Sequence, residues 1–161
     1  MVENQLLKKI GFLKDLPNEI LKKVGAIALL ETFEKESILF KQNQEKTHLY
    51  MLVSGKIFLD CGLASGKSLT LDEVSAGRTV GVSSLLGVYP SAFTAICAEP
   101  STIITVSGQD MRQLFLEDFE TGHAVMLKVV EIFRSRMRMH TRQFLHSMLN
   151  HHEIIKLESN N

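Results

Sequence analysis

The sequence predicts a mainly β domain with flanking helices: short helices come first, short strands fill the centre, and a long helix follows. Three observations support this fold class. Apolar residues recur at helical spacing before about residue 26, and β-like segments broken by turn residues fill about residues 27–107. From about residue 108 to 152 the pattern is helical again. The centre favours an antiparallel sandwich, a jelly roll or a small barrel, because many short strands are typical of those folds.

The N-terminal segment, about residues 1–26, is expected to form short helices. Apolar residues recur at helical spacing at Leu6, Leu7, Ile10 and Leu13. Pro17 and Glu19 indicate the start of a second helix. Proline fits the first helical position, and an acidic side chain is favourable in the first turn.

The central segment, about residues 27–107, is expected to hold the strands. These are predicted at 26–33, 37–40, 48–53, 56–60, 68–74, 93–98 and 102–106. Ser65 and Gly66 predict a hairpin turn between two of them, because glycine adopts a positive φ at no steric cost.

The last segment, about residues 108–152, predicts one helix from Gln109 to Asp118 and a long helix from Phe119 to His152. The long helix carries a heptad seam at Met126, Val130, Phe133, Met137, His140 and Phe144. About 30 residues at 1.5 Å each span roughly 45 Å, which is more than one small domain covers. We therefore expect a parallel homodimer through this seam. The alternative is an amphipathic helix packed on its own domain. His140 is interpreted as a polar residue that fixes the register.

Composition and charge argue against several classes of function. The 161 residues carry 18 basic and 18 acidic side chains, so no net charge attracts nucleic acid or an anionic membrane. No apolar run approaches the length of a membrane-spanning helix, and the N-terminus has no signal-peptide core, so we expect a cytoplasmic protein. The absence of a nucleophile elbow, P-loop, HExxH or CxxC motif argues against an enzyme. No metal site is predicted.

Five separated segments carry a resemblance to a known family. They are FLKDLP at 12–17, LYMLVSGKI at 49–57, AGRTVG at 76–81, SSLL at 83–86 and YPSAFTA at 89–95. In this order they resemble the effector domain of the catabolite-activator (cyclic-AMP receptor) superfamily. The resemblance implies a double-stranded β-helix, that is, a jelly roll or β-roll, with a long C-terminal helix. Few residues follow that helix, so we expect no helix-turn-helix domain and no direct DNA binding.

The resemblance also implies a ligand site in the family's phosphate-binding cassette. The expected ligand-binding residues are Gly81, Val82, Ser83, Ser84, Ser91, Ala92 and Thr94. Val82 stands where the family has a glutamate that binds the ribose hydroxyl, and Ser91 where it has an arginine that pairs with the cyclic phosphate. Both departures remove charged contacts, so we expect weakened binding of cyclic AMP or cyclic GMP. Gly81 still permits close approach of an anion to the amides of residues 82–84.

Two functions are compatible with these observations. The first is a stand-alone sensor, with residues 1–161 as a single domain, that binds a small ligand in the β-roll and signals through the dimerising helix. The second is a ligand-free scaffold for dimerisation and protein interaction, with a degenerate pocket. A pocket filled by Phe93 or Tyr89 favours the scaffold, and an open polar cavity favours the sensor. A separate protein partner, including a DNA-binding chain, stays open.

Overall fold

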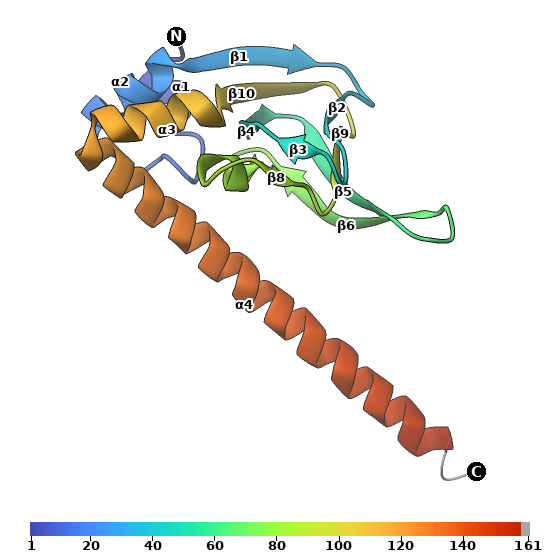
Figure 1. The fold of residues 1–161 in the computed structure, drawn as a ribbon. Coiled ribbons are helices and arrows are strands. Elements are labelled where there is room, and N and C mark those ends of the chain that lie inside the picture. Colours follow the sequence, from blue (N-terminus) through green and yellow to red (C-terminus); the bar gives the residue numbers. More distant parts are fainter. Residues whose placement is uncertain (159–161) are drawn as a thin grey trace. The chain divides into compact units, whose positions relative to one another are not determined.

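The computed structural model describes the backbone of residues 1–158 and the side chains of residues 1–149. The chain divides into two compact units, Met1–Met126 and the part from Leu127 onward, and each is described by itself. Figure 1 shows that the first unit holds all the strands. The prediction of a single domain over the whole chain stays a prediction.

The first unit begins with two short helices, α1 (Asn4–Leu7) and α2 (Asn18–Ala26). Pro17 stands immediately before α2 and Glu19 lies in its first turn, as expected. The prediction of a strand starting at residue 26 is wrong, because α2 includes Ala26. The amide of Ile27 donates to the carbonyl of Val24 and closes the helix before the first strand begins.

The strands form two four-stranded antiparallel sheets and one two-stranded sheet (Figure 1). The first sheet contains, in order, β1 (Ala28–Phe33), β10 (Ser101–Ser107), β4 (His48–Ser54) and β7 (Thr79–Val80). The second contains β2 (Ile38–Phe40), β9 (Thr94–Cys97), β5 (Lys56–Gly62) and β6 (Ser68–Ser75). The small sheet pairs β3 (Glu45–Lys46) with β8 (Tyr89–Pro90). This antiparallel arrangement confirms the predicted β-roll.

A hydrophobic core lies between the two large sheets. Strand side chains alternate between two faces, so one face of each sheet can supply apolar residues to a shared interior. Leu52 and Ile103 come from the first sheet, and Ile57 and Ala95 from the second, and all four are fully buried. Phe93 is partly buried and packs against this cluster. The core therefore joins the two sheets close to the start of β9, where the cassette (residues 81–94) ends.

The turn between β5 and β6 has the predicted conformation. Gly66 has a φ of 80°, and no atom lies within 4 Å of a Cβ placed there. The amide of Leu63 donates to the carbonyl of Lys67 at 2.8 Å and closes the hairpin. The sequence missed β3, β7 and β8, because two residues show no alternation that a pattern search can detect.

Two helices follow the strands, as expected. α3 (Gly108–Glu117) begins after Ser107, whose hydroxyl accepts a hydrogen bond from the amide of Asp110. α4 (Phe119–Glu158) continues beyond the predicted end at His152, since neither proline nor glycine interrupts it there. α1, α2 and α3 lie at one end of the strands, beside β1 and β10 (Figure 1). Within the described residues, no helix is both long and apolar enough to cross a membrane.

Candidate functional site

The cassette begins at a glycine that the backbone requires. Gly81 has a φ of 77° and precedes a short 3-10 helix, η1 (Val82–Leu85). A Cβ at this position would lie 2.4 Å from the carbonyl oxygen of His48 on β4. Both the left-handed backbone and the close packing therefore exclude any larger residue. Gly81 brings η1 against β4. The packing of these two elements therefore requires glycine at this position even when no ligand is bound.

η1 is held from the other side by α3. The guanidinium of Arg112 donates a hydrogen bond to the carbonyl of Ser84, and the amide of Ser84 donates to the carbonyl of Gly81 at 2.9 Å. The side chain of Ser84 is 1% exposed, and its hydroxyl has no hydrogen-bond partner among the described residues. Val82 is equally buried. The cassette is therefore linked directly to the first helix that follows the sheets.

The hydroxyls at the end of the cassette are engaged within the protein. The Ser91 hydroxyl donates to the carbonyl of Phe93 at 2.6 Å and lies 3.2 Å from its amide. The Thr94 hydroxyl accepts from the amide of Gln42 at 3.0 Å. Ser91 is 2% exposed, whereas Ala92 is exposed and Thr94 is partly exposed. These bonds fix the shape of the turn between β8 and β9.

The structure gives the predicted site residues different roles. Gly81, Val82 and Ser84 pack against β4 and α3, Ser91 and Thr94 fix the following turn, and Ser83 is partly exposed. The predicted ligand contacts are untested by this arrangement and stay predictions.

Lys46 is a charged residue beside the cassette that the sequence analysis missed. Residues 42–46 run alongside residues 89–91, with Lys46 opposite Tyr89 and Gln42 bridged to Ser91. The ammonium of Lys46 lies 5.8 Å from the centroid of the Phe40 ring and 5.9 Å from that of Phe93. Both distances are within the range of a cation–π contact. A positive charge is thus present on β3, opposite Tyr89 and close to the turn that contains Ser91.

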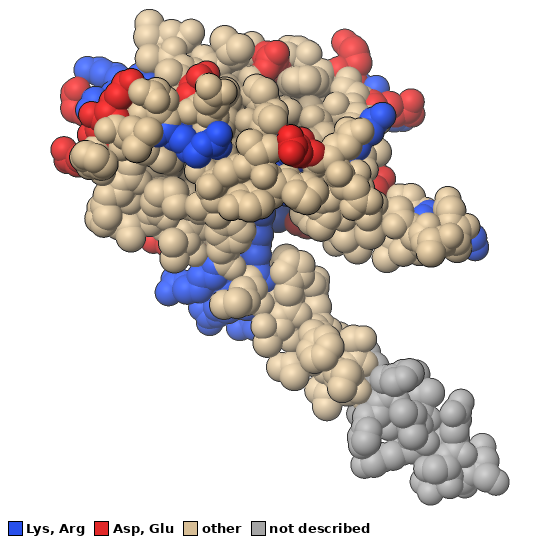
Figure 2. Space-filling view, viewed as in Figure 1, with Lys and Arg blue, Asp and Glu red and all other residues tan. Residues whose placement is uncertain are grey.

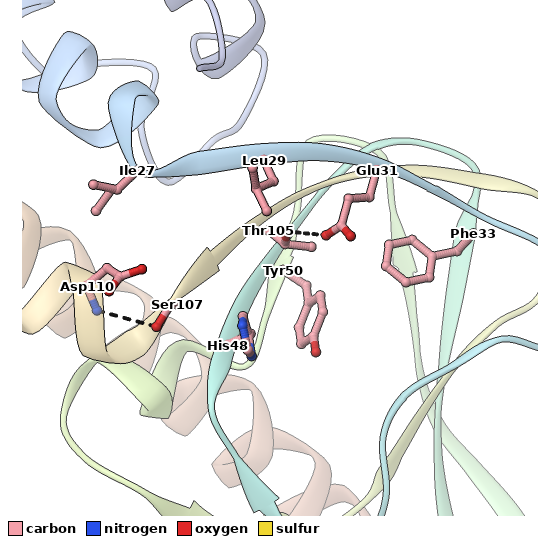
Figure 3. Close-up of a pocket in the computed structure, with 9 residues that line it drawn as sticks. All are labelled: Ile27, Leu29, Glu31, Phe33, His48, Tyr50, Thr105, Ser107 and Asp110. Carbon is pink, nitrogen blue, oxygen red and sulfur yellow. Dashed lines mark hydrogen bonds between the residues drawn. The ribbon is translucent and has the colours of Figure 1, made fainter.

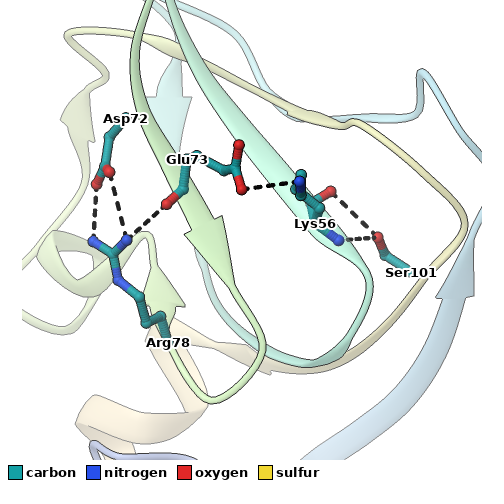
Figure 4. Close-up of polar contacts among 5 residues, drawn as sticks. All are labelled: Lys56, Asp72, Glu73, Arg78 and Ser101. Carbon is teal, nitrogen blue, oxygen red and sulfur yellow. Dashed lines mark hydrogen bonds and ion pairs between the residues drawn. The ribbon is translucent and has the colours of Figure 1, made fainter.

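A second polar cluster braces the strand that leads into the cassette. Arg78 donates to the carboxylate of Asp72 and to the carbonyl of Glu73, both at 2.8 Å (Figure 4). The carboxylate of Glu73 also pairs with Lys56 at 2.9 Å, and this hydrogen bond raises the pKa of Lys56. The guanidinium of Arg78 is engaged in holding the β6–β7 turn, so its position indicates a structural role.

A separate hollow of about 370 Å³ lies in the first unit (Figure 3). None of the predicted site residues lines it, although Gly81 packs against two of its lining residues, His48 and Tyr50. Its lining consists of Ile27, which lies between α2 and β1, and of residues on β1, β4, β10 and the start of α3: Leu29, Glu31, Phe33, His48, Tyr50, Thr105, Ser107 and Asp110. Burial raises the pKa of Tyr50, and the nearby carboxylate of Glu31 adds to that effect. The sequence offered no signal for this hollow, because its residues come from four elements far apart in the chain.

Charges of both signs are interspersed over the face of the first unit that Figure 2 shows. That face therefore presents no patch of one sign to a nucleic acid. Within the residues whose side chains the structure describes, no group of three or more His, Cys, Asp or Glu could hold a metal ion.

Comparison with known families assigns the chain. The sequence profile described as "Cyclic nucleotide-binding domain" matches residues 30–118, which is more than half of the chain. The chain therefore belongs to the cyclic nucleotide-binding domain family. Members of this family have a regulatory or sensor fold that is not enzymatic, so the chain is a regulatory domain of this kind. A search of curated proteins found no sequence that matches it.

Solved structures share the fold along most of the chain. A candidate cyclic nucleotide-binding protein from Geobacter metallireducens has a TM-score of 0.73 and 25% identity, and the match covers 85% of this chain and 99% of that one. The N-terminal domain of a transcriptional regulator from Streptomyces coelicolor has a TM-score of 0.71 and 19% identity, with 83% and 93% covered. The sensor domain of the transcriptional regulator DNR from Pseudomonas aeruginosa has a TM-score of 0.66 and 19% identity, with 84% and 91% covered.

Proposed function

We propose that this chain senses a small anionic ligand at the cassette of its β-roll and transmits the signal through a homodimer formed by α4. The observation that carries the proposal is the position of Lys46. Lys46 lies on β3, which pairs with β8 in the second half of the cassette. Its ammonium lies over the rings of Phe40 and Phe93. The cytoplasmic location, like the absence of direct DNA binding, stays a prediction from the sequence.

The ammonium of Lys46 is suited to bind a different kind of anion from a cyclic nucleotide. An arginine binds a phosphate with a planar fork of two hydrogen bonds, whereas a lysine offers a compact charge with three donors. Such a charge suits a small anion that does not need the fork. The half-buried ring of Phe93, near the end of the cassette, packs against the core and reduces the space for a ligand there. We therefore expect a ligand smaller than a cyclic nucleotide.

The contact between Arg112 and Ser84 supports a route for the signal. A ligand can change the position of a helix only if it binds two helix arrangements with different affinity. Because the carbonyl of Ser84 on η1 accepts from Arg112 on α3, a shift of η1 would act directly on α3. The next link is Asp118, between α3 and α4, which accepts hydrogen bonds from the amide and hydroxyl of Thr121.

The apolar side chains of α4 support the homodimer. Val130, Phe133, Met137 and Phe144 on the predicted seam are between 39% and 66% exposed, and His140 is exposed as well. Exposed apolar side chains at heptad spacing are favourable when a second helix covers them. Met126, the first seam residue, is partly buried.

The ligand-free scaffold is the second candidate function. The observation in its favour is that the hydroxyls of Ser91 and Thr94 already have partners within the protein, while Phe93 packs against the core. Tyr89, by contrast, is 52% exposed and does not fill the roll. The scaffold therefore predicts a dimer without any bound small molecule.

Native mass spectrometry of freshly purified protein separates the two candidates, because it reports bound small molecules and oligomeric state together. The sensor predicts a dimer that retains a small anion, or that takes up added inorganic phosphate saturably and binds cyclic AMP and cyclic GMP weakly. A dimer that stays ligand-free with phosphate and with both nucleotides would support the scaffold. Tight binding of cyclic AMP would contradict the proposed preference for a smaller anion.

A further inference from the structure

We infer that the hollow between β1, β4, β10 and the start of α3 is a binding site for a small organic cation. It shares no lining residue with the cassette, and its charge is opposite to that of Lys46. The inference therefore goes beyond the proposed function and stands on a separate set of residues. Three properties of the hollow carry it: its aromatic wall, its carboxylates and its size.

Aromatic side chains form one wall of the hollow (Figure 3). Phe33 and Tyr50 line it together with His48, and the centroids of the Tyr50 and His48 rings are 6.1 Å apart. The Tyr50 hydroxyl donates to the carbonyl of Leu39 at 3.0 Å, which holds the ring in place. The face of an aromatic ring attracts a cation, most strongly for the side chains of Trp and Tyr.

Two carboxylates from different elements supply the negative charge. Glu31 lies on β1 and Asp110 in the first turn of α3, and the lining contains neither lysine nor arginine. The hydroxyl of Thr105, which is 4% exposed, donates a hydrogen bond to the carboxylate of Glu31. In Figure 3 this carboxylate lies between Thr105 and the Phe33 ring. Burial and, to a lesser degree, the Glu31 charge raise the pKa of Tyr50, so this carboxylate lies close to the aromatic wall.

The hollow is large enough for a small organic molecule and has an apolar part. Its volume of about 370 Å³ falls within the usual range for ligand pockets. Ile27 and Leu29 line it beside the polar groups. An inorganic cation would gain nothing from these apolar side chains. An alkyl ammonium ion would use the carboxylates, the rings and the apolar part together.

Choline and n-butylammonium are the probes that test this inference, and 3,3-dimethylbutan-1-ol is the uncharged control with the shape of choline. Binding is followed by amide chemical shifts in two-dimensional NMR of the full chain. We expect saturable shifts at Leu29, Thr105 and Ser107 with at least one charged probe. Tighter binding of choline would indicate that cation–π attraction dominates, and tighter binding of n-butylammonium would indicate that hydrogen bonding dominates. Either result supports the site.

Substitution E31Q removes the charge but keeps an oxygen that accepts from Thr105, so the fold is expected to survive. It should weaken binding of the charged probe at least about tenfold. The matched control E34Q removes an exposed carboxylate outside the lining and should leave binding unchanged. The inference is overturned by equal binding of the uncharged control, by unchanged affinity in E31Q, or by no saturation up to ~10 mM of either cation.

Discussion

The β-roll unit and the helix beyond Leu127 differ in where their apolar side chains lie. In the roll, Leu52, Ile57 and Ile103 are fully buried in the core between the sheets. In the helix, Phe133 and Met137 on the seam are exposed. A stretch of helix gains little stability from its own residues, since most helical stability in proteins comes from packing.

The proposed function assigns different roles to these two regions. The roll covers its own core, so its polar and charged residues near the cassette can serve a ligand. The helix leaves an apolar seam exposed, and in the proposed function a second copy in parallel register covers it. Ligand sensing and dimerisation can then be disturbed separately, and that separation can be tested.

The largest expected effect follows from placing charges on the helix seam. The double substitution F133E/M137E puts four like charges into the interface of a dimer, which are costly to bury. It should raise the dimer dissociation constant at least ~100-fold, measured by sedimentation equilibrium. The matched control S135E changes an exposed residue outside the seam and should leave the dimer intact. A dimer that persists in F133E/M137E would show that the seam is not the interface and would break the comparison.

An effect of similar size is expected from the cassette glycine. Substitution G81A should cost about 2–4 kcal/mol of unfolding free energy, because the residue is left-handed and its Cβ would meet the carbonyl of His48. Substitution G66A is the matched control, since Gly66 has a similar φ but open space around it. It should cost only about 1–2 kcal/mol. Chemical denaturation measures both, and equal losses would argue against tight packing of η1 on β4.

The smallest effect concerns the pair that joins α2 to the junction between α3 and α4. The carboxylate of Asp118 accepts from the ammonium of Lys23 and from Thr121, and these contacts hold its pKa well below its usual range. A lowered pKa in the folded state stabilises the fold above the unfolded value, about 3.9, and this contribution is lost as pH falls below it.

Substitution D118N should therefore lower Tm by a few degrees at neutral pH, and the difference from the wild type should shrink below about pH 4. The control E117Q removes a neighbouring exposed carboxylate that accepts a hydrogen bond from Gln113, and it should change Tm less. Scanning calorimetry across this pH range checks both. A difference between D118N and the wild type that grows on acidification would have the wrong sign.

The sequence predicted the fold well because local residue patterns located most of its helices and strands. β-like segments separated by turn residues marked the long strands, the heptad marked α4, and the cassette glycine was found through its place in the family motif. The roles of Ser91 and Thr94 could not be predicted in this way. The hydroxyl of Thr94 accepts from Gln42, which is distant in sequence, and that of Ser91 bonds to its own turn.

Lys46 and the second hollow escaped prediction for a related reason. Lys46 reaches the cassette through the pairing of β3 with β8, and these two-residue strands leave no periodic signal. The hollow gathers Glu31 and Asp110 from opposite ends of the β-roll sequence. A site whose residues are brought together by strand pairing depends on the register of those strands, and that register follows from the whole fold.

Calorimetric titration of inorganic phosphate into the wild type, K46R and K46Q tests the central claim most directly. K67Q, which removes the charge of an exposed lysine in the β5–β6 turn, is the matched control. The account predicts saturable binding to the wild type and K67Q, partial binding to K46R, and at least about tenfold weaker binding to K46Q. Equal affinity in the wild type and K46Q would contradict the claim that Lys46 supplies the charge for an anion in the β-roll.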